Sequence, residues 1–393
     1  MVSRSYPSPG PLLLLAGIFY LNFVSRILLA PLLPEIEATL SISHGQAGTF
    51  FLCISIGYFV SLLGSGFISA RLGHKRTIVV SMLALGLSLL MVSRSPSLPL
   101  LQTSFLLLGM AAGLYLPSGI TTITDLYPSH QLGRAFGVHE IAPNLAFLTA
   151  PLFAAWLLPK LGWQQVILLF AGVTTVAAVL YAVVGRETQL KGAAPELSRY
   201  RELLSRPEFW LMSTLFSMGI SATHGVYSVL PMFLISEHGM DEASANMLVG
   251  LSRSTTLITA FFGGWLADRF GSFKTIAVVL LLTGLFTALL GLGPARLLPV
   301  WIWLQPLLAV CFFAPAFSVL SQIGSPGARN IVISLAIPIA FVLGGGVIPA
   351  GITRLADNGN FSLGLTLTGV FIAGGSLLIT LLPGARKNDS EKQ

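Results

Sequence analysis

Long apolar runs, separated by short polar connections, dominate this chain. A helix that crosses the hydrocarbon core of a bilayer, about 30 Å thick, needs roughly 20 apolar residues, because each residue adds about 1.5 Å. Twelve runs of this kind follow one another and predict an all-α membrane protein with twelve transmembrane helices. The expected spans lie near residues 11–33, 45–69, 77–94, 100–124, 135–158, 164–185, 208–235, 243–267, 275–293, 298–321, 331–353 and 362–384.

Composition agrees with a chain that is surrounded by lipid. Hydrophobic residues make up 54% of the 393 residues and charged residues only 9%, whereas about a quarter of an ordinary soluble domain is charged. The net charge of +7 comes from short clusters between the apolar runs. Because these clusters form no continuous basic stripe, we expect the chain to contact membrane lipid and no nucleic acid. We also expect it to be a monomer.

Lysine and arginine are distributed unequally between the two sets of loops. Of the 22 basic residues, 16 fall in loops on one side and four on the other, and the remaining two, Arg26 and Arg253, lie inside spans. Loops rich in these residues stay in the cytoplasm. We therefore expect both termini in the cytoplasm of a plasma membrane, the inner membrane if the cell is bacterial.

The longest polar connection divides the chain. Residues 186–207 separate spans six and seven and carry five basic residues. The predicted organisation is a first six-helix bundle, a cytoplasmic linker, a second six-helix bundle and a cytoplasmic tail, at residues 1–185, 186–207, 208–385 and 386–393.

The two halves repeat at an offset of 198 residues. The offset aligns a set of glycine, arginine, threonine and proline positions from three separate regions. Gly66, Arg71, Gly73, Thr77, Pro117 and Pro151 align with Gly264, Arg269, Gly271, Thr275, Pro315 and Pro349. Parallel repeats pack about an axis normal to the membrane, with a substrate cavity at their interface. The repeat therefore predicts two pseudo-symmetric bundles.

One loop of each half carries a motif. Residues 264–271, Gly-Trp-Leu-Ala-Asp-Arg-Phe-Gly, resemble the signature loop of the major facilitator superfamily (MFS), and residues 66–76 resemble its first-half copy. The resemblance implies the MFS fold and secondary transport. It also implies a cytoplasmic latch in the outward-facing state, weaker in the first half because Ala70 replaces the usual aspartate. Alternatively, the basic residues of these loops only set the orientation of the chain in the membrane. The latch candidates are Gly66, Arg71, Gly73, Gly264, Asp268, Arg269 and Gly271.

Two arginines inside spans suggest a binding site. An arginine at the centre of a membrane helix costs roughly 2.5–3.5 kcal/mol and cannot lose its proton, so a function is the default explanation. Because guanidinium binds carboxylate and phosphate through two parallel hydrogen bonds, Arg26 and Arg253 favour an anionic substrate. The alternative is that each pairs with an internal carboxylate or carbonyl, or extends to the interface.

The repeat adds a histidine to this site. His224 stands 198 residues after Arg26, so equivalent helices present a basic pair across the expected cavity. Such a pair resembles the organophosphate:phosphate antiporters, which use an arginine from each of these helices. Residues 20–26 also resemble the first span of the anion:cation symporters, with Ser25 where those proteins usually carry an acid. A packing role for His224 is an equal alternative.

Other polar residues complete the candidate site. Five side chains offer hydrogen bonds to a polar substrate: Asn22, Tyr58, Tyr115, Tyr227 and Gln305. For coupling, Glu140 beside His139 near the start of span five could load and release a proton. The alternative for Glu140 is a salt bridge to Arg134 that closes the cytoplasmic gate. Asp125, at the end of span four, is a further candidate, and for it we favour a structural role over proton coupling.

No pattern for catalysis or cofactor binding stands out. The sequence shows no nucleophile with a base, no phosphate loop and no metal cluster, and its two cysteines lie inside apolar runs. We expect no enzyme activity, cofactor or metal. The predicted function is secondary active transport of a small organic anion by alternating access, with a proton or counter-substrate as coupling partner. Alternatives are an exporter of drugs or lipids and a transport-inactive sensor or scaffold.

The charge distribution makes topology testable. A reporter fused after Gln393, or inserted near Gly192, should read cytoplasmic, because 16 basic residues against four oppose the inverted insertion. Paired alkaline phosphatase and green fluorescent protein fusions measure this. A periplasmic signal at either position would overturn the orientation.

Overall fold

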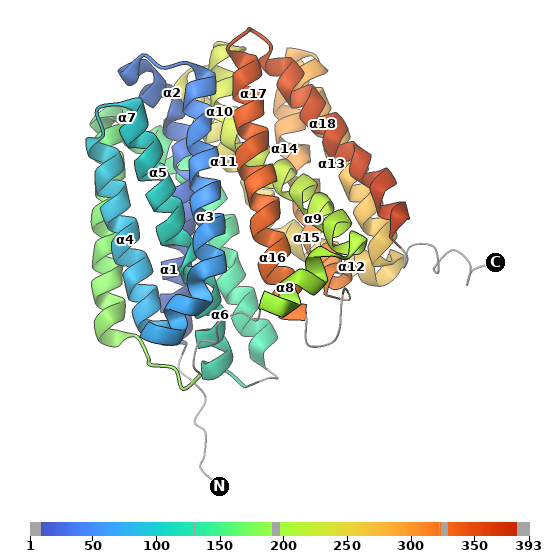
Figure 1. Cartoon of the computed structure of the whole chain (residues 1–393). Helices are drawn as coiled ribbons and strands as arrows, with labels where there is room; N and C mark the ends of the chain where they lie inside the picture. Colours follow the sequence, from blue (N-terminus) through green and yellow to red (C-terminus); the bar gives the residue numbers. More distant parts are fainter. Residues whose placement is uncertain (1–8, 129–130, 191–196, 322, 324–328, 383–393) are drawn as a thin grey trace, which may run out of the picture. The chain divides into compact units, whose positions relative to one another are not determined.

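The computed structural model describes residues 9–128, 131–190, 197–321, 323 and 329–382, and these residues form helices and no strand (Figure 1). Within these described residues, ten segments are long and apolar enough to cross a membrane. Nine of them hold one predicted span each, and the tenth, Leu132–Val184, holds two. The predicted all-α membrane fold is confirmed.

The helix α7 (Leu132–Val184) contains a turn. At 53 residues it would measure about 80 Å if it were straight, far more than a bilayer core. Gly162 has φ 73° and ψ 159°, which ends the first helix and starts the second. Spans five and six are therefore separate helices that share one continuous segment. Pro143 and Pro151 lie inside the first of them, and its backbone stays helical at both positions.

The eighth predicted span is not among the ten segments. It consists of α11 (Glu242–Ser252), a 3₁₀ turn (Arg253–Thr255) and α12 (Thr256–Phe270). The helix changes its hydrogen-bond pattern at the buried Arg253. A local 3₁₀ turn of this kind is a common position for a hinge or a functional residue.

The described chain divides into two compact units. The first contains residues 1–29 and 56–195. Its helices are α1 (Gly10–Ile27), the later part of α3 (His44–Leu72), α4 (His74–Arg94), α5 (Leu98–Gly113), α6 (Tyr115–Leu126) and α7. Within this unit α7 packs most extensively on α4 and α1.

The second unit contains residues 30–55 and 196–393. Its main helices are α2 (Leu29–Leu40), the first part of α3, α8 (Leu197–Leu204), α9 (Pro207–Ile220), α10 (Val226–Ser236), α11, α12, α13 (Ser272–Leu292), α14 (Leu298–Ala309), α15 (Phe313–Leu320), α16 (Arg329–Phe341), α17 (Ile348–Ala356) and α18 (Phe361–Leu378). The helices α13 and α18 form its most extensive contact. The predicted boundaries at 185 and 208 stay predictions.

The internal repeat has the same backbone geometry in both copies. Gly73, between α3 and α4, has φ 79° and ψ 160°, and Gly271, between α12 and α13, has φ 88° and ψ 145°. The hydroxyl of Thr77 donates to the Gly73 carbonyl at 2.7 Å, and that of Thr275 donates to the Gly271 carbonyl at 2.9 Å. Each glycine reverses the chain, and each threonine fixes the start of the next helix.

The proline repeat also produces equivalent interruptions. Pro117 and Pro315 lack the N–H that would bond to the carbonyl four residues earlier. The helix breaks at Leu114, between α5 and α6, and it tightens into a 3₁₀ turn at Val310–Phe312, between α14 and α15. Spans four and ten are therefore irregular at equivalent positions.

Replacing Gly271 tests whether its backbone conformation is required. An added Cβ would meet nothing within 4 Å, so Gly271→Ala isolates the cost of the positive φ. We expect a loss of about 1–3 kcal/mol and a lower melting temperature in detergent. Gly264→Ala, inside α12 with only an ordinary contact at 4.0 Å, should melt at or slightly above wild type. Equal melting temperatures of the two variants would show that the positive φ at Gly271 does not require glycine.

Candidate functional site

Arg26 is buried in the last turn of α1. Its guanidinium carbon lies 4.6 Å from the Phe23 ring centroid and 4.5 Å from that of Tyr58, which comes from α3. Only 4% of the residue is exposed. A desolvated cation–π contact contributes about 2 kcal/mol. The first unit thus retains a permanent positive charge in its interior.

Neighbouring polar side chains of α1 connect helices. The Asn22 amide donates to the Ala112 carbonyl of α5 at 3.1 Å, and the Ser25 hydroxyl donates to the Leu21 carbonyl at 2.7 Å. Both side chains are buried. Asn22 therefore uses a donor for packing beside Arg26, and its predicted contact with substrate stays a prediction.

Tyr115, His139 and Glu140 form a hydrogen-bonded chain in the first unit. The Tyr115 hydroxyl lies 2.9 Å from the Leu15 carbonyl and 3.0 Å from Nε2 of His139. Nδ1 of His139 lies 3.4 Å from a carboxylate oxygen of Glu140. His139 is fully buried and stacks on Phe19 with ring centroids 4.3 Å apart, whereas the Glu140 side chain is 60% exposed.

The hydrogen bonds that link Tyr115, His139 and Glu140 limit where their protons can lie. A tyrosine hydroxyl has one hydrogen, and the Leu15 carbonyl can only accept, so both contacts are satisfied when Tyr115 donates to Leu15 and Nε2–H of His139 donates to Tyr115. In that arrangement Nδ1 of His139 and the Glu140 carboxylate are both acceptors, and a proton placed between them would complete the contact.

The remaining candidate gate residues of the first unit lie apart from these hydrogen-bonded side chains. A carboxylate oxygen of Asp125 accepts from the backbone N–H of Gln189 at 3.1 Å. Arg134 is exposed in the first turn of α7, and among the described residues no ion pair joins it to Glu140. Six residues apart on a helix, these two side chains point to different faces. The predicted gate roles of Asp125 and Arg134 stay predictions.

Arg253 is a buried arginine of the second unit. Its Nη2 donates to the Thr223 carbonyl at 3.3 Å, and its guanidinium carbon lies 5.1 Å from the Tyr227 ring centroid. Thr223 belongs to a π-helical segment (Ser221–Gly225) between α9 and α10. Such a segment widens the helix and turns carbonyls away from their usual partners. The backbone irregularity therefore supplies an acceptor for the arginine.

His224 and Gln305 lie around the same π-helical segment. The His224 ring packs against Phe341 with centroids 5.5 Å apart, beside Gly345. The Gln305 amide donates to the Ala222 carbonyl at 2.7 Å and to the Thr287 hydroxyl at 3.2 Å. Gln305 thus holds the segment in place. The predicted pairing of Arg26 with His224 joins residues of different units and stays a prediction.

The motif loops place their charged residues on the surface. Arg71 is exposed at the end of α3, and Asp268 and Arg269 are exposed at the end of α12. The guanidinium carbon of Arg269 lies 5.6 Å from the Trp265 ring centroid. Gly66 and Gly264 lie inside the helices that end at Gly73 and Gly271. A latch by Asp268 stays a prediction.

A polar cluster in the second unit was missed in the sequence. Asp357, after α17, accepts from the backbone N–H of Gly45 at 2.9 Å and from the Ser43 hydroxyl at 3.0 Å. Glu37 lies 2.8 Å from Nδ1 of His44. Ser43 before a helix start was a visible capping signal, and its hydroxyl accepts from the Gln46 N–H at 3.3 Å. Its other partner, Asp357, lies 314 residues away. Local sequence could not identify that partner.

Comparison with known proteins agrees with this architecture. The sequence pattern described as "Major Facilitator Superfamily" matches residues 15–349. A solved structure, a "Bacterial Homolog to Human Lysosomal Transporter, Spinster, in Inward-facing And Occupied Conformation", shares the fold with a TM-score of 0.84 at 17% identity, over 100% of this chain and 99% of that one.

Several relatives are named for anions. A "Probable nitrate transporter NarT" of Staphylococcus epidermidis is 21% identical over 65% of this chain and 66% of its own length, just under two thirds. A "Nitrite extrusion protein" of Bacillus subtilis is 21% identical over 91% of this chain and 86% of its own length. With the family pattern spanning most of the sequence, this chain belongs to the Major Facilitator Superfamily, a family of secondary transporters.

Proposed function

We propose that the chain transports a small oxyanion by alternating access, and that Arg26 binds the anion. The buried guanidinium between Phe23 and Tyr58 carries this proposal. Its positive charge is permanent, so each empty transporter bears the cost of holding it away from water. An anion that binds there offsets this cost, which favours anionic over neutral substrates.

The shape of the guanidinium narrows the class of anion. Its planar fork of N–H groups matches two coplanar oxygens of one carboxylate or nitrate. The relatives named for nitrate and nitrite support planar oxyanions, including inorganic ones, at 21% identity. The proposal therefore covers nitrate-like ions as well as the organic anions expected from the sequence.

We further propose that His139 and Glu140 carry a coupling proton. Such a proton would lie between a fully buried imidazole and a largely exposed carboxylate. Glu140 also interacts electrostatically with the phenols of Tyr58 and Tyr115, and Tyr58 packs on Arg26. A proton on this pair would reduce the negative charge near Tyr58 and thereby alter how strongly Arg26 attracts an anion.

Two other functions differ in their expected substrate behaviour. An exporter of amphipathic drugs or lipids would bind apolar cations or neutral molecules with little dependence on Arg26. A sensor or scaffold would bind without translocation. The buried arginines in both units favour the anion transporter.

Substitution of Arg26 tests the binding role. Arg26→Ala should weaken binding of nitrate or a small carboxylate by about tenfold to a hundredfold, as expected for a lost charge-assisted contact of about 1.5–3 kcal/mol. Arg26→Lys should bind weakly, because a point charge lacks the fork. Isothermal titration of purified protein measures both. The exposed Arg296→Ala is the matched control and should bind like wild type.

A stability measurement on the same preparations separates structure from binding. If Arg26→Ala melts far below wild type while its folded fraction binds normally, the arginine is a structural residue and the proposed site is wrong.

Glu140→Gln tests the coupling role. In proteoliposomes that contain a pH-sensitive dye, wild-type uptake of the anion should acidify the lumen, and Glu140→Gln should not, because an amide cannot accept the transported proton. Exchange of labelled for unlabelled anion should persist in the variant. The exposed Glu202→Gln is the matched control. Unchanged lumen acidification by Glu140→Gln would show that the proton travels elsewhere.

A further inference from the structure

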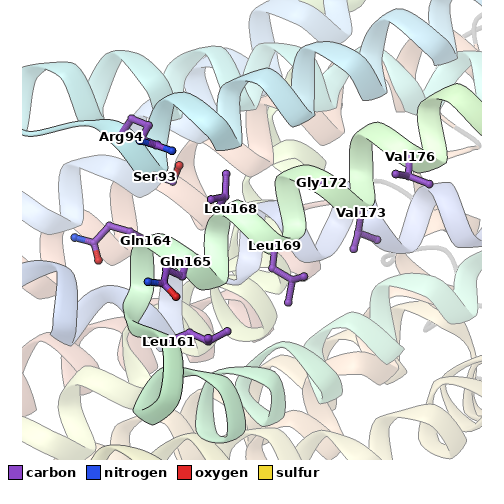
Figure 2. Close-up of a pocket in the computed structure, with 10 residues that line it drawn as sticks. All are labelled: Ser93, Arg94, Leu161, Gln164, Gln165, Leu168, Leu169, Gly172, Val173 and Val176. Carbon is purple, nitrogen blue, oxygen red and sulfur yellow. The ribbon is translucent and has the colours of Figure 1, made fainter.

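A groove lies on the outside of the first unit, between α4 and the second half of α7 (Figure 2). Its volume is about 1000 Å³. One end is polar and the rest is apolar, so the groove itself is amphipathic. It shares no residue with the candidate site around Arg26, and the inference below is independent of the proposed function.

The floor of the groove is one exposed face of α7. Leu168, Leu169, Val173 and Val176 recur at helical spacing and are 38% to 68% exposed. Gly172 lies among them, and a Cβ there would meet nothing within 4 Å, so its missing side chain deepens the groove. From Leu168 to Val176 the floor extends about 12 Å along the helix. This length accommodates a stretch of a lipid acyl chain.

The polar end combines one cation with two carboxamides. Arg94 is the last residue of α4 and is exposed, and Gln164 and Gln165 stand in the first turn of the helix that follows Gly162 (Figure 2). Because these are the ends of membrane-spanning helices, they lie at the level of lipid headgroups. Guanidinium and carboxamide N–H groups are suitable donors to phosphate oxygens.

We infer that this groove binds one phospholipid with a net negative headgroup. The headgroup phosphate lies at Arg94, and an acyl chain lies along the floor from Leu168 to Val176. The single cation at one end complements such a lipid in both charge and direction. A partner transmembrane helix is less suited, because helix contacts in membranes favour several small residues, and this floor has only Gly172 among leucines and valines.

The two parts of the groove make different contributions. Acyl chains are apolar everywhere in the bilayer, so the floor adds shape and little preference between lipids. A basic residue near the membrane surface attracts anionic lipids, which makes Arg94 the source of headgroup preference. Variants at the two ends should therefore have distinct effects.

Photo-crosslinking of the full-length protein in vesicles tests this. The probes are phosphatidylglycerol and phosphatidylcholine, each with a diazirine on one acyl chain, and mass spectrometry maps the adducts. Wild type should give more phosphatidylglycerol than phosphatidylcholine adducts on residues 164–176. Arg94→Gln should lower the phosphatidylglycerol yield about fivefold, to the phosphatidylcholine level, and Arg94→Lys should retain the preference.

Gly172→Leu tests the floor. An added Cβ there would meet nothing within 4 Å, so a leucine would project into the groove and should lower the adduct yield of both lipids. The matched controls are Arg296→Gln, an exposed arginine of the second unit, and Gly374→Leu, where a Cβ also meets nothing within 4 Å. Both controls should label residues 164–176 like wild type.

Three lipid-labelling results would overturn the inference. They are an unchanged phosphatidylglycerol yield in Arg94→Gln, an equal loss of yield in the two control variants, and wild-type labelling of residues 164–176 that does not distinguish the two headgroups. Preferential occupation by a second protein, seen as a protein cross-link in place of lipid adducts, would also do so.

Discussion

The permanent charge of two buried guanidinium groups is the constraint on which the rest of this structure depends. Arg26 and Arg253 cannot release their protons, so the surrounding helices must stabilise charge inside the membrane. In the first unit two aromatic rings do so. In the second unit a π-helical segment presents the Thr223 carbonyl and Tyr227 adds its ring. The irregular backbone of the π-helical segment thus supplies a hydrogen-bond acceptor to the buried Arg253.

The internal repeat conserves the turns and not the charged groups. Gly73 and Gly271 have closely similar dihedral angles, and the threonine four residues after each caps the same carbonyl. The position equivalent to Arg26 is His224, which packs on Phe341, and the position equivalent to Arg253 is Ser55. The two units share a framework, and their polar interiors have diverged.

Sequence predicted what depends on length and local backbone chemistry. Apolar length identified the spans, and glycine spacing identified both reversals, because these features need no distant partner. The contacts of the candidate site depend on tertiary partners. No local pattern indicates that Tyr58 packs on Arg26, that Tyr115 connects Leu15 with His139, or that the Gln305 donors bind a π-helical carbonyl. Aromatic and amide side chains have many possible partners, and only the fold selects one.

Counterflow in proteoliposomes tests whether the protein carries an anion across the membrane by alternating access. Vesicles that contain purified protein are loaded with unlabelled nitrate or a small carboxylate and diluted into a trace of the labelled anion. Alternating access exchanges substrate across the membrane, so we expect transient, saturable accumulation of the label with no ion gradient applied. Saturable binding of the anion without any accumulation of label would contradict it.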